Sequence, residues 1–352
     1  MHTSVHTSLL ALALAAGSLA YATTDARAPR RASVAKQTRT TAPTTNAAAV
    51  FAPLPASDAV ALVELRRLLN DAVPRALASD QKRLGEVNAD VETFRARTGI
   101  NAREFETLAV GSRVVKLASG ATKLDHNVAV GRGRFDINAI VAAGRTSSKN
   151  RHTQQTHAGK TVHVFRLDEE LKLFGLLKMR VGELAVCALD AQTLAVGEPE
   201  AVRAAVDAAG GRGALSPTDL AVLTQPRTPE TLVTFGGRVA PELTAGIDLG
   251  NAEITRSVAS VREMFGAVRM VAAGFDVQTT LRTSNESEAR ELGGVLATLK
   301  QAAPFLLSQV EGERGRVARN AAERLQVATQ GTDVQLRLEV PQADITTLVG
   351  VL

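Results

Sequence analysis

Tryptophan is absent from this chain of 352 residues, and its single tyrosine is Tyr21. The remaining aromatic residues are ten phenylalanines. Carbohydrate sites, aromatic cages and the central anchors of tight protein interfaces usually draw on Trp and Tyr, whose rings combine apolar area with a polar group. We therefore expect neither a sugar-binding module nor a high-affinity aromatic interface.

Cysteine is almost absent as well, since Cys187 is the only one in the sequence. The chain therefore cannot form an intramolecular disulfide. Cys187 lies in the apolar run 184–189, which predicts a small core residue on a strand. A chain of this length can bury a substantial core without disulfide bonds.

Motifs for catalysis and cofactor binding are also missing. Gly159-Lys160-Thr161 resembles the end of a phosphate-binding loop, but Gln154 stands where the first glycine belongs. No cofactor is expected, and no catalytic residue can be assigned. A Ser-His-Asp set drawn from distant positions stays open, since such triads are defined by geometry rather than by spacing.

The chain begins with a pattern that predicts export. An apolar run from Leu9 to Ala20 precedes the small-x-small sequence Ala20-Tyr21-Ala22, which is typical of a secretory signal peptide over residues 1–22. The run is shorter than the roughly 20 residues that a membrane-spanning helix needs. We expect an exported protein, periplasmic or extracellular, with no transmembrane segment after signal removal.

Residues 23–49 are rich in Thr, Ala and Arg and have little apolar surface to bury, which predicts a disordered basic linker. The linker holds five Lys or Arg and one Asp, which leaves 36 basic and 35 acidic residues in the rest of the chain. The excess of basic residues therefore belongs mainly to the linker. A folded domain that binds nucleic acid should carry that charge on its own surface, so we expect no specific nucleic-acid binding.

The remaining chain repeats an order of two strands followed by a helix. The predicted sets are 105–114, 127–134 and 137–143; 184–189, 193–197 and 199–209; 268–273, 276–283 and 286–305; and 325–329, 333–340 and 342–349. A strand over 58–65 and helical segments over 66–97, broken near Pro74, precede the first set. A strand over 231–239 and a helix over 252–265 precede the third set.

These elements fall into two halves, residues 50–215 and 216–352. Each contains a βαββαβ order, which is typical of the split βαβ or ferredoxin-like arrangement. We predict an α+β fold of two similar halves, with largely antiparallel sheets and helices on one face. Internal duplication and independent elements in the same order are both compatible with this pattern.

Four segments carry a resemblance to a known group. They are LPASDAVALVELRRLLNDAVPRAL (54–77), FETLAVGSRV (105–114), LAVGEPEAVRAAV (194–206) and LEVPQADI (338–345). In these segments the chain resembles a group of uncharacterised exported bacterial proteins, over roughly residues 54–352. The resemblance implies export and an α+β fold. It implies no activity and no site residues.

The histidines beyond the signal peptide suggest a metal site at first sight; they are His126, His152, His157 and His163. The last three lie on a predicted hairpin that turns at Ala158-Gly159, with His157 opposite Lys160 and His163 opposite Gln154. Because side chains alternate along a strand, His152 and His163 share one face and His157 lies on the other. The imidazoles do not converge, so we expect no metal.

One basic group supports a functional hypothesis. Arg145, Lys149, Arg151 and Lys160 lie on a polar loop and hairpin with no acidic residue between them. The group is either a solvated protrusion or a contact for an anionic partner. We predict a non-catalytic exported binding or structural protein whose partner is an anionic envelope component or a protein. The alternative is an envelope enzyme, hydrolase-like, with a site assembled from distant residues.

Overall fold

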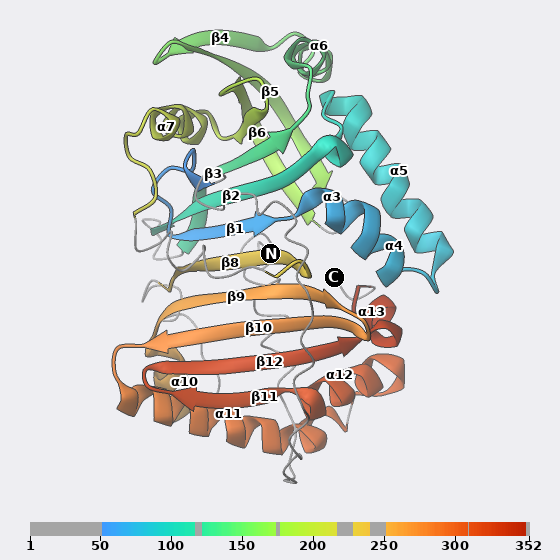
Figure 1. Cartoon of the computed structure of the whole chain (residues 1–352), viewed down its shortest axis with the longest axis vertical. Coiled ribbons are helices and arrows are strands. Elements are labelled where there is room, and N and C mark those ends of the chain that lie inside the picture. Colours follow the sequence, from blue (N-terminus) through green and yellow to red (C-terminus); the bar gives the residue numbers. More distant parts are fainter. Residues whose placement is uncertain are drawn as a thin grey trace, which may run out of the picture.

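The structure is a computed structural model, and it describes residues 51–116, 122–173, 177–216, 228–239, 251–308 and 310–349. The predicted signal peptide (1–22) and linker (23–49) lie outside these residues. One antiparallel sheet of twelve strands runs through the molecule (Figure 1). The α+β class and the antiparallel character are confirmed, but the strands form one continuous sheet.

The strands fall into two groups that meet at β1 and β8. Those of the first half are β1 (Ala59–Val63), β2 (Phe105–Lys116), β3 (Thr122–Gly133), β4 (His152–His157), β5 (Lys160–Leu173), β6 (Leu177–Ala188) and β7 (Thr193–Gly197). Those of the second half are β8 (Thr231–Arg238), β9 (Val261–Val271), β10 (Gly274–Thr283), β11 (Gln326–Gln330) and β12 (Asp333–Pro341).

The helices lie between these strands. They are α3 (Leu65–Arg67), the π-helical turn η1 (Leu68–Ala72), α4 (Val73–Ala76), α5 (Gln81–Thr98), the 3₁₀ turn η2 (Ala102–Glu104), α6 (Ile137–Ser147), α7 (Pro199–Ala209), α10 (Ala252–Ala259), α11 (Glu286–Leu307), α12 (Gly312–Arg324) and α13 (Gln342–Val349). Among the described helices, none combines the length and the apolar character that crossing a membrane requires.

The two halves share one strand order, but it is not the predicted split βαβ order. Outward from the central pair, the order is β1-β2-β3-β7-β6-β5-β4 on one side and β8-β9-β10-β12-β11 on the other. A ferredoxin-like sheet would insert a strand between β1 and β2, whereas here they pair directly and antiparallel. The β4–β5 hairpin is an addition that the second half lacks.

The reason for this correction lies in the connection between β1 and β2. The chain leaves β1 through α3, η1 and α4, and it returns through α5, which Figure 1 shows running back toward the sheet. Two helical passes bring the chain back to the end of the sheet that β1 reached, so β2 must run antiparallel to β1. A single helical pass would have produced the parallel pair of a split βαβ unit.

Helices cover both faces of the first half, which corrects the prediction of one covered face. On β6, Cys187 packs in the same core cluster as Val202 of α7. Its neighbour Val186 packs in another cluster with Ile140 of α6. Because neighbouring residues point to opposite faces and both are apolar, each face of this strand needs a cover. The burial of Cys187 confirms its prediction as a core residue.

The described helices of the second half lie on one face of the sheet. Val334, Leu336 and Leu338 of β12 pack in the clusters that α11 and α12 complete. The alternate positions of the same strands are charged, and they form ion pairs across the opposite face, such as Arg337 with Asp276. The alternation is therefore that of a half-buried antiparallel sheet.

Several element boundaries follow from local chemistry. The Asp80 carboxylate accepts a hydrogen bond from the Arg83 amide and begins α5. Gly99 ends the helix with φ of 71°, and a Cβ there would meet the Ala139 carbonyl oxygen at 2.8 Å. Glycine thus allows α5 and α6 to approach each other.

Two predictions about the second half needed correction. The helix predicted over 252–265 ends at Ala259, and Val261 begins β9. Val261 and Phe265 are both buried, but a register shift in β9 places them on opposite faces. Val261 packs in the cluster under α11, whereas the Phe265 ring lies under the Arg282 guanidinium. Helix α12 was not predicted, although Val317, Ala321 and Leu325 recur at helical spacing and are buried.

Candidate binding site at the base of the hairpin

The β4–β5 hairpin forms through a tight two-residue turn. Ala158 and Gly159 have φ of 45° and 77°, the positive values that type I′ turns require. His157 lies opposite Lys160, and His163 lies opposite Gln154, which confirms the predicted register. This register places the histidines of the hairpin on different faces.

On the α6 face, two histidines and a phenylalanine stack. His152 Nε2 lies 3.2 Å from His163 Nδ1, and the ring centroids are 5.4 Å apart. The His152 ring also stacks on Phe165, with centroids 4.9 Å apart. Arg145 Nε donates to His152 Nδ1 at 3.4 Å. An arginine from a helix and two imidazoles from two strands therefore form one group, which we call the Arg–His cluster (Arg145, His152, His163).

Close packing of α6 on β5 creates this cluster. A Cβ on Gly144 would meet the Phe165 ring at 2.7 Å, so the glycine lets the helix lie directly on the ring. A glycine inside a helix costs roughly 0.5–1 kcal/mol relative to alanine, and here it permits the contact that carries Arg145 to His152. No local sequence pattern links Arg145 to the histidines, because their contact depends on how α6 packs on β5.

The pKa values of both histidines lie below the ordinary 6.5. Burial is the main cause in each case, because it disfavours the charged imidazolium. Repulsion from Arg145 lowers both pKa values further, and His152 also lowers that of His163. At neutral pH the pair is therefore uncharged.

This shift predicts a pH-dependent stability. Between the lowered pKa values and 6.5, the unfolded chain binds more protons than the folded chain, so stability rises with pH. We expect the melting temperature to fall as the pH is lowered through this window. The double variant His152→Gln and His163→Gln should show a flatter dependence over the same pH range. An unchanged pH dependence in that variant would contradict the assignment.

His157 belongs to the opposite face. Its Nε2 lies 3.0 Å from Asp207 Oδ2 at the end of α7, and Arg212 donates to the other carboxylate oxygen at 2.6 Å. The hydrogen bond from His157 is the main cause that lowers the pKa of Asp207, and the charges of His157 and Arg212 lower it further. His157 thus fastens the tip of the hairpin to α7.

His126 lies at a third place, on β3, with Nε2 3.8 Å from Glu200. The four histidines therefore do not share one site. Within the described residues, no three metal-binding side chains are grouped closely enough to hold an ion.

The structure brings together three of the four basic residues and separates the fourth. Arg145, Lys149 and Arg151 lie where α6 turns into β4, and all are exposed. Lys149 and Asn150 form this turn with φ of 52° and 61°. Lys160 lies at the far end of the hairpin. It is about 17 Å from the His152 end of β4, because five residues separate the two ends and each adds about 3.4 Å. It pairs with His157, so its side chain points to the α7 face rather than the α6 face.

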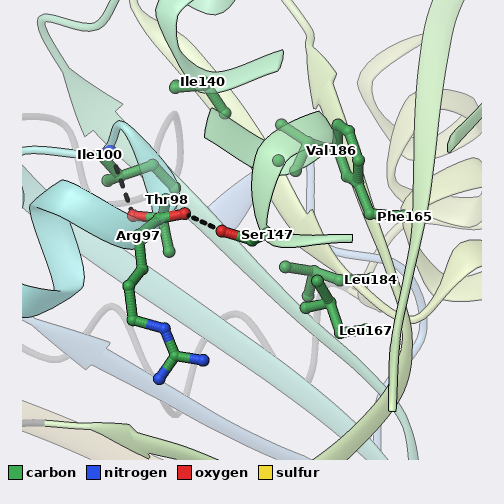
Figure 2. A pocket seen from close by; sticks show the side chains of 10 residues that line it. Arg97, Thr98, Ile100, Ile140, Ser147, Phe165, Leu167, Leu184 and Val186 are labelled. Carbon is green, nitrogen blue, oxygen red and sulfur yellow. Dashed lines mark hydrogen bonds between the residues drawn. The ribbon is translucent and has the colours of Figure 1, made fainter. Parts of the chain in front are cut away.

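A small apolar cavity lies beside the cluster, between α5, α6 and strands β5 and β6 (Figure 2). Its walls include Ile100, Ile140, Phe165, Leu167 and Val186. The cavity has a volume of about 30 Å³, which is room for about one water molecule. Ligand pockets usually start at roughly 300 Å³, so this cavity is part of the packing around Phe165 rather than a substrate site.

No protein-family model and no curated protein matches the chain. Crystal forms III, I and IV of the Treponema protein TP0453 are similar to it in structure, with TM-scores of 0.42, 0.44 and 0.42 at identities of 11%, 8% and 10%. The similarity covers 86% of this chain and 98%, 96% and 95% of the other.

Proposed function

We propose that this chain is an exported, non-catalytic binding protein of the periplasm or cell envelope, and that it binds an anionic partner at the base of the hairpin. The supporting observation is the exposure of Arg145 and Lys149 and their lack of an acidic partner within the described residues. Both are exposed, and within the described residues neither forms an ion pair with a carboxylate. Other arginines of the sheet differ, such as Arg166 with Glu183 and Arg282 with Asp333.

The charge at the base of the hairpin makes anion binding dependent on salt and on pH. Two exposed cations that form no ion pair with a carboxylate of the described residues attract an anion, and the attraction weakens with salt because the Debye length shortens. Protonation of the neighbouring histidine pair adds positive charge once the pH falls to their lowered pKa values. Anion binding should therefore strengthen on acidification, while stability falls. Acid denaturation would weaken both binding and stability, so stronger anion binding together with lower stability distinguishes protonation of this site from acid denaturation.

One observation bears on the alternative of an envelope enzyme. His157 and Asp207 form a histidine–carboxylate pair, which is the base and orienting half of a hydrolytic triad. In the described part of the chain, no hydrogen bond joins His157 to a serine, threonine or cysteine nucleophile. Arg212 and Asp207 instead complete a contact that holds the hairpin, so we favour the binding function.

A charge-reversal experiment tests the proposal. The probe is fluorescent poly-L-glutamate at low ionic strength, and the protein is the full chain with Arg27, Arg30, Arg31, Lys36 and Arg39 changed to Gln. In this background, Arg145→Glu with Lys149→Glu should weaken binding about tenfold or more, since two attractive contacts become repulsive. The measurement is a binding titration by fluorescence anisotropy.

A matched control reverses two exposed cations elsewhere, Lys82 on α5 and Arg290 on α11. Both lie near helix N-termini, where Glu is tolerated. The control variant Lys82→Glu with Arg290→Glu has the same net charge as the test variant. Equal weakening in both variants would show attraction to net charge alone, and the proposed site would be wrong.

A further inference from the structure

The hairpin base adjoins a free edge of the sheet. Among the described strands, β4 is the last of the twelve and pairs only with β5 (Figure 1). Its four middle residues, Thr153 to Thr156, are all exposed. An edge strand presents backbone donors and acceptors that can pair with another chain.

The backbone groups that face outward can be identified from the register. In an antiparallel pair, residues alternate between bonding the neighbour and pointing away from it. Arg166 N donates to Arg151 O at 3.0 Å, so the odd-numbered residues of this strand bond β5. The even-numbered residues, His152, Gln154 and Thr156, therefore direct their backbone groups to the free edge. The His152 amide donates to Asn150 O at 2.9 Å. The amides of Gln154 and Thr156 have no backbone acceptor within the described part of the chain.

Charge identifies the kind of segment that fits this edge. The Arg–His cluster lies at the His152 end, and Lys149 lies in the turn just before it. A second copy would bring a second set of cations to the same edge, and the chain's own linker is basic. Repulsion between like charges therefore disfavours both a second copy of the chain and the linker as the segment that binds this edge. An acidic segment of another protein is complementary.

We propose that β4 binds an extended acidic segment of a partner protein as an added strand, with a carboxylate of that segment meeting Arg145. This inference rests on the proposed function and adds the partner class and the mode of binding. Backbone hydrogen bonds to Gln154 and Thr156 hold the segment, as in other strand-addition complexes. The carboxylate fixes which end of the segment lies at the cluster.

N-methylated peptides separate strand addition from plain charge attraction. The probe is a fluorescein-labelled ten-residue peptide of alternating Thr and Val with two Glu at one end. Two derivatives carry N-methyl groups on alternate residues, one on the odd set and one on the even set. Charge is the same in all three. Because only one set of amides faces β4, one derivative should lose about tenfold or more in affinity while the other binds like the parent.

A variant of the protein provides the complementary test. Gln154→Pro removes an outward amide without removing a bond to β5, and proline is tolerated at such an edge position. We expect at least about a tenfold loss in peptide affinity, whereas the control Gln154→Ala keeps the amide and should bind within about twofold of the parent. Melting curves verify that both variants fold.

The outcomes distinguish the two proposals. Equal binding of all three peptides, together with a loss on reversal of Arg145 and Lys149, overturns strand addition and leaves the anionic site intact. Binding that is insensitive to the charge reversal overturns the proposed function itself. Loss with one methylated derivative and with Gln154→Pro supports the added strand.

Discussion

Phe165→Ala is expected to lower the free energy of unfolding by about 3–5 kcal/mol, the usual cost of truncating a buried phenylalanine. The Phe165 side chain is fully enclosed, at 2% exposure, and it contacts three parts of the structure at once. It belongs to the core cluster under α5 and α6, lines the small cavity and stacks on His152. Chemical denaturation measures the effect.

The same variant should also change the histidine cluster. Without the ring, His152 loses its stacking partner and becomes more hydrated, so its pKa should move back toward 6.5. An NMR titration of the imidazole measures this shift. Phe305→Ala is the matched control, because that ring is 77% exposed and its loss should change stability by less than about 0.5 kcal/mol. Equal destabilisation by the two variants would contradict the role of Phe165.

Asp276→Ala is expected to cost about 3 kcal/mol. The carboxylate is 3% exposed, and it accepts from Arg337 Nε at 2.8 Å and from Gln278 at 3.1 Å, with Arg269 at 3.5 Å. It joins β9, β10 and β12 on the face opposite the described helices α11 and α12. Removal of one partner from a buried pair costs roughly 3–5 kcal/mol. We expect the lower end, because the two arginines are 30% and 45% exposed and can regain water.

The control for this prediction is Glu339→Ala. Glu339 contacts the same Arg337 at 2.9 Å, but its side chain is 56% exposed. Surface ion pairs of this kind contribute about 0–1 kcal/mol. Thermal and urea unfolding of both variants should therefore separate them clearly. A similar loss in both would mean that the burial of Asp276 adds nothing to its ion pairs.

Local patterns in the sequence were sufficient for many elements. The predicted bounds of β7, α7 and α13 agree with the structure, because proline, strand alternation and apolar spacing act within a few residues. The same kind of reasoning failed at Val261 and Phe265, whose spacing of four residues fits a helix face, because in the structure they belong to β9 and a register shift separates their faces. Helix α12 has few apolar residues and was overlooked for that reason.

The candidate site was predictable only in part. The register of the hairpin followed from its turn, so the separation of His157 from His152 and His163 was available from the sequence. The grouping of Arg145 with the histidines depends on where α6 lies on β5, and no local pattern encodes that contact. The position of Lys160 on the other face follows from its pairing with His157, whereas shared charge alone does not determine on which face a side chain lies.

By itself, the sequence determined the α+β class and the order of most elements. It also determined the alternation of side chains along each strand, which decides the face of a hairpin on which a residue lies. These depend on interactions between residues close together in the chain, where the geometry of a helix or a strand fixes which side chains are neighbours. Only the tertiary structure decided the order of strands in the sheet, the cover on both faces of the first half and the free edge at β4. Strand order depends on pairing across long connections, such as β1 with β8. Many alternative pairings would satisfy the same local pattern, and the packing of the whole core selects among them.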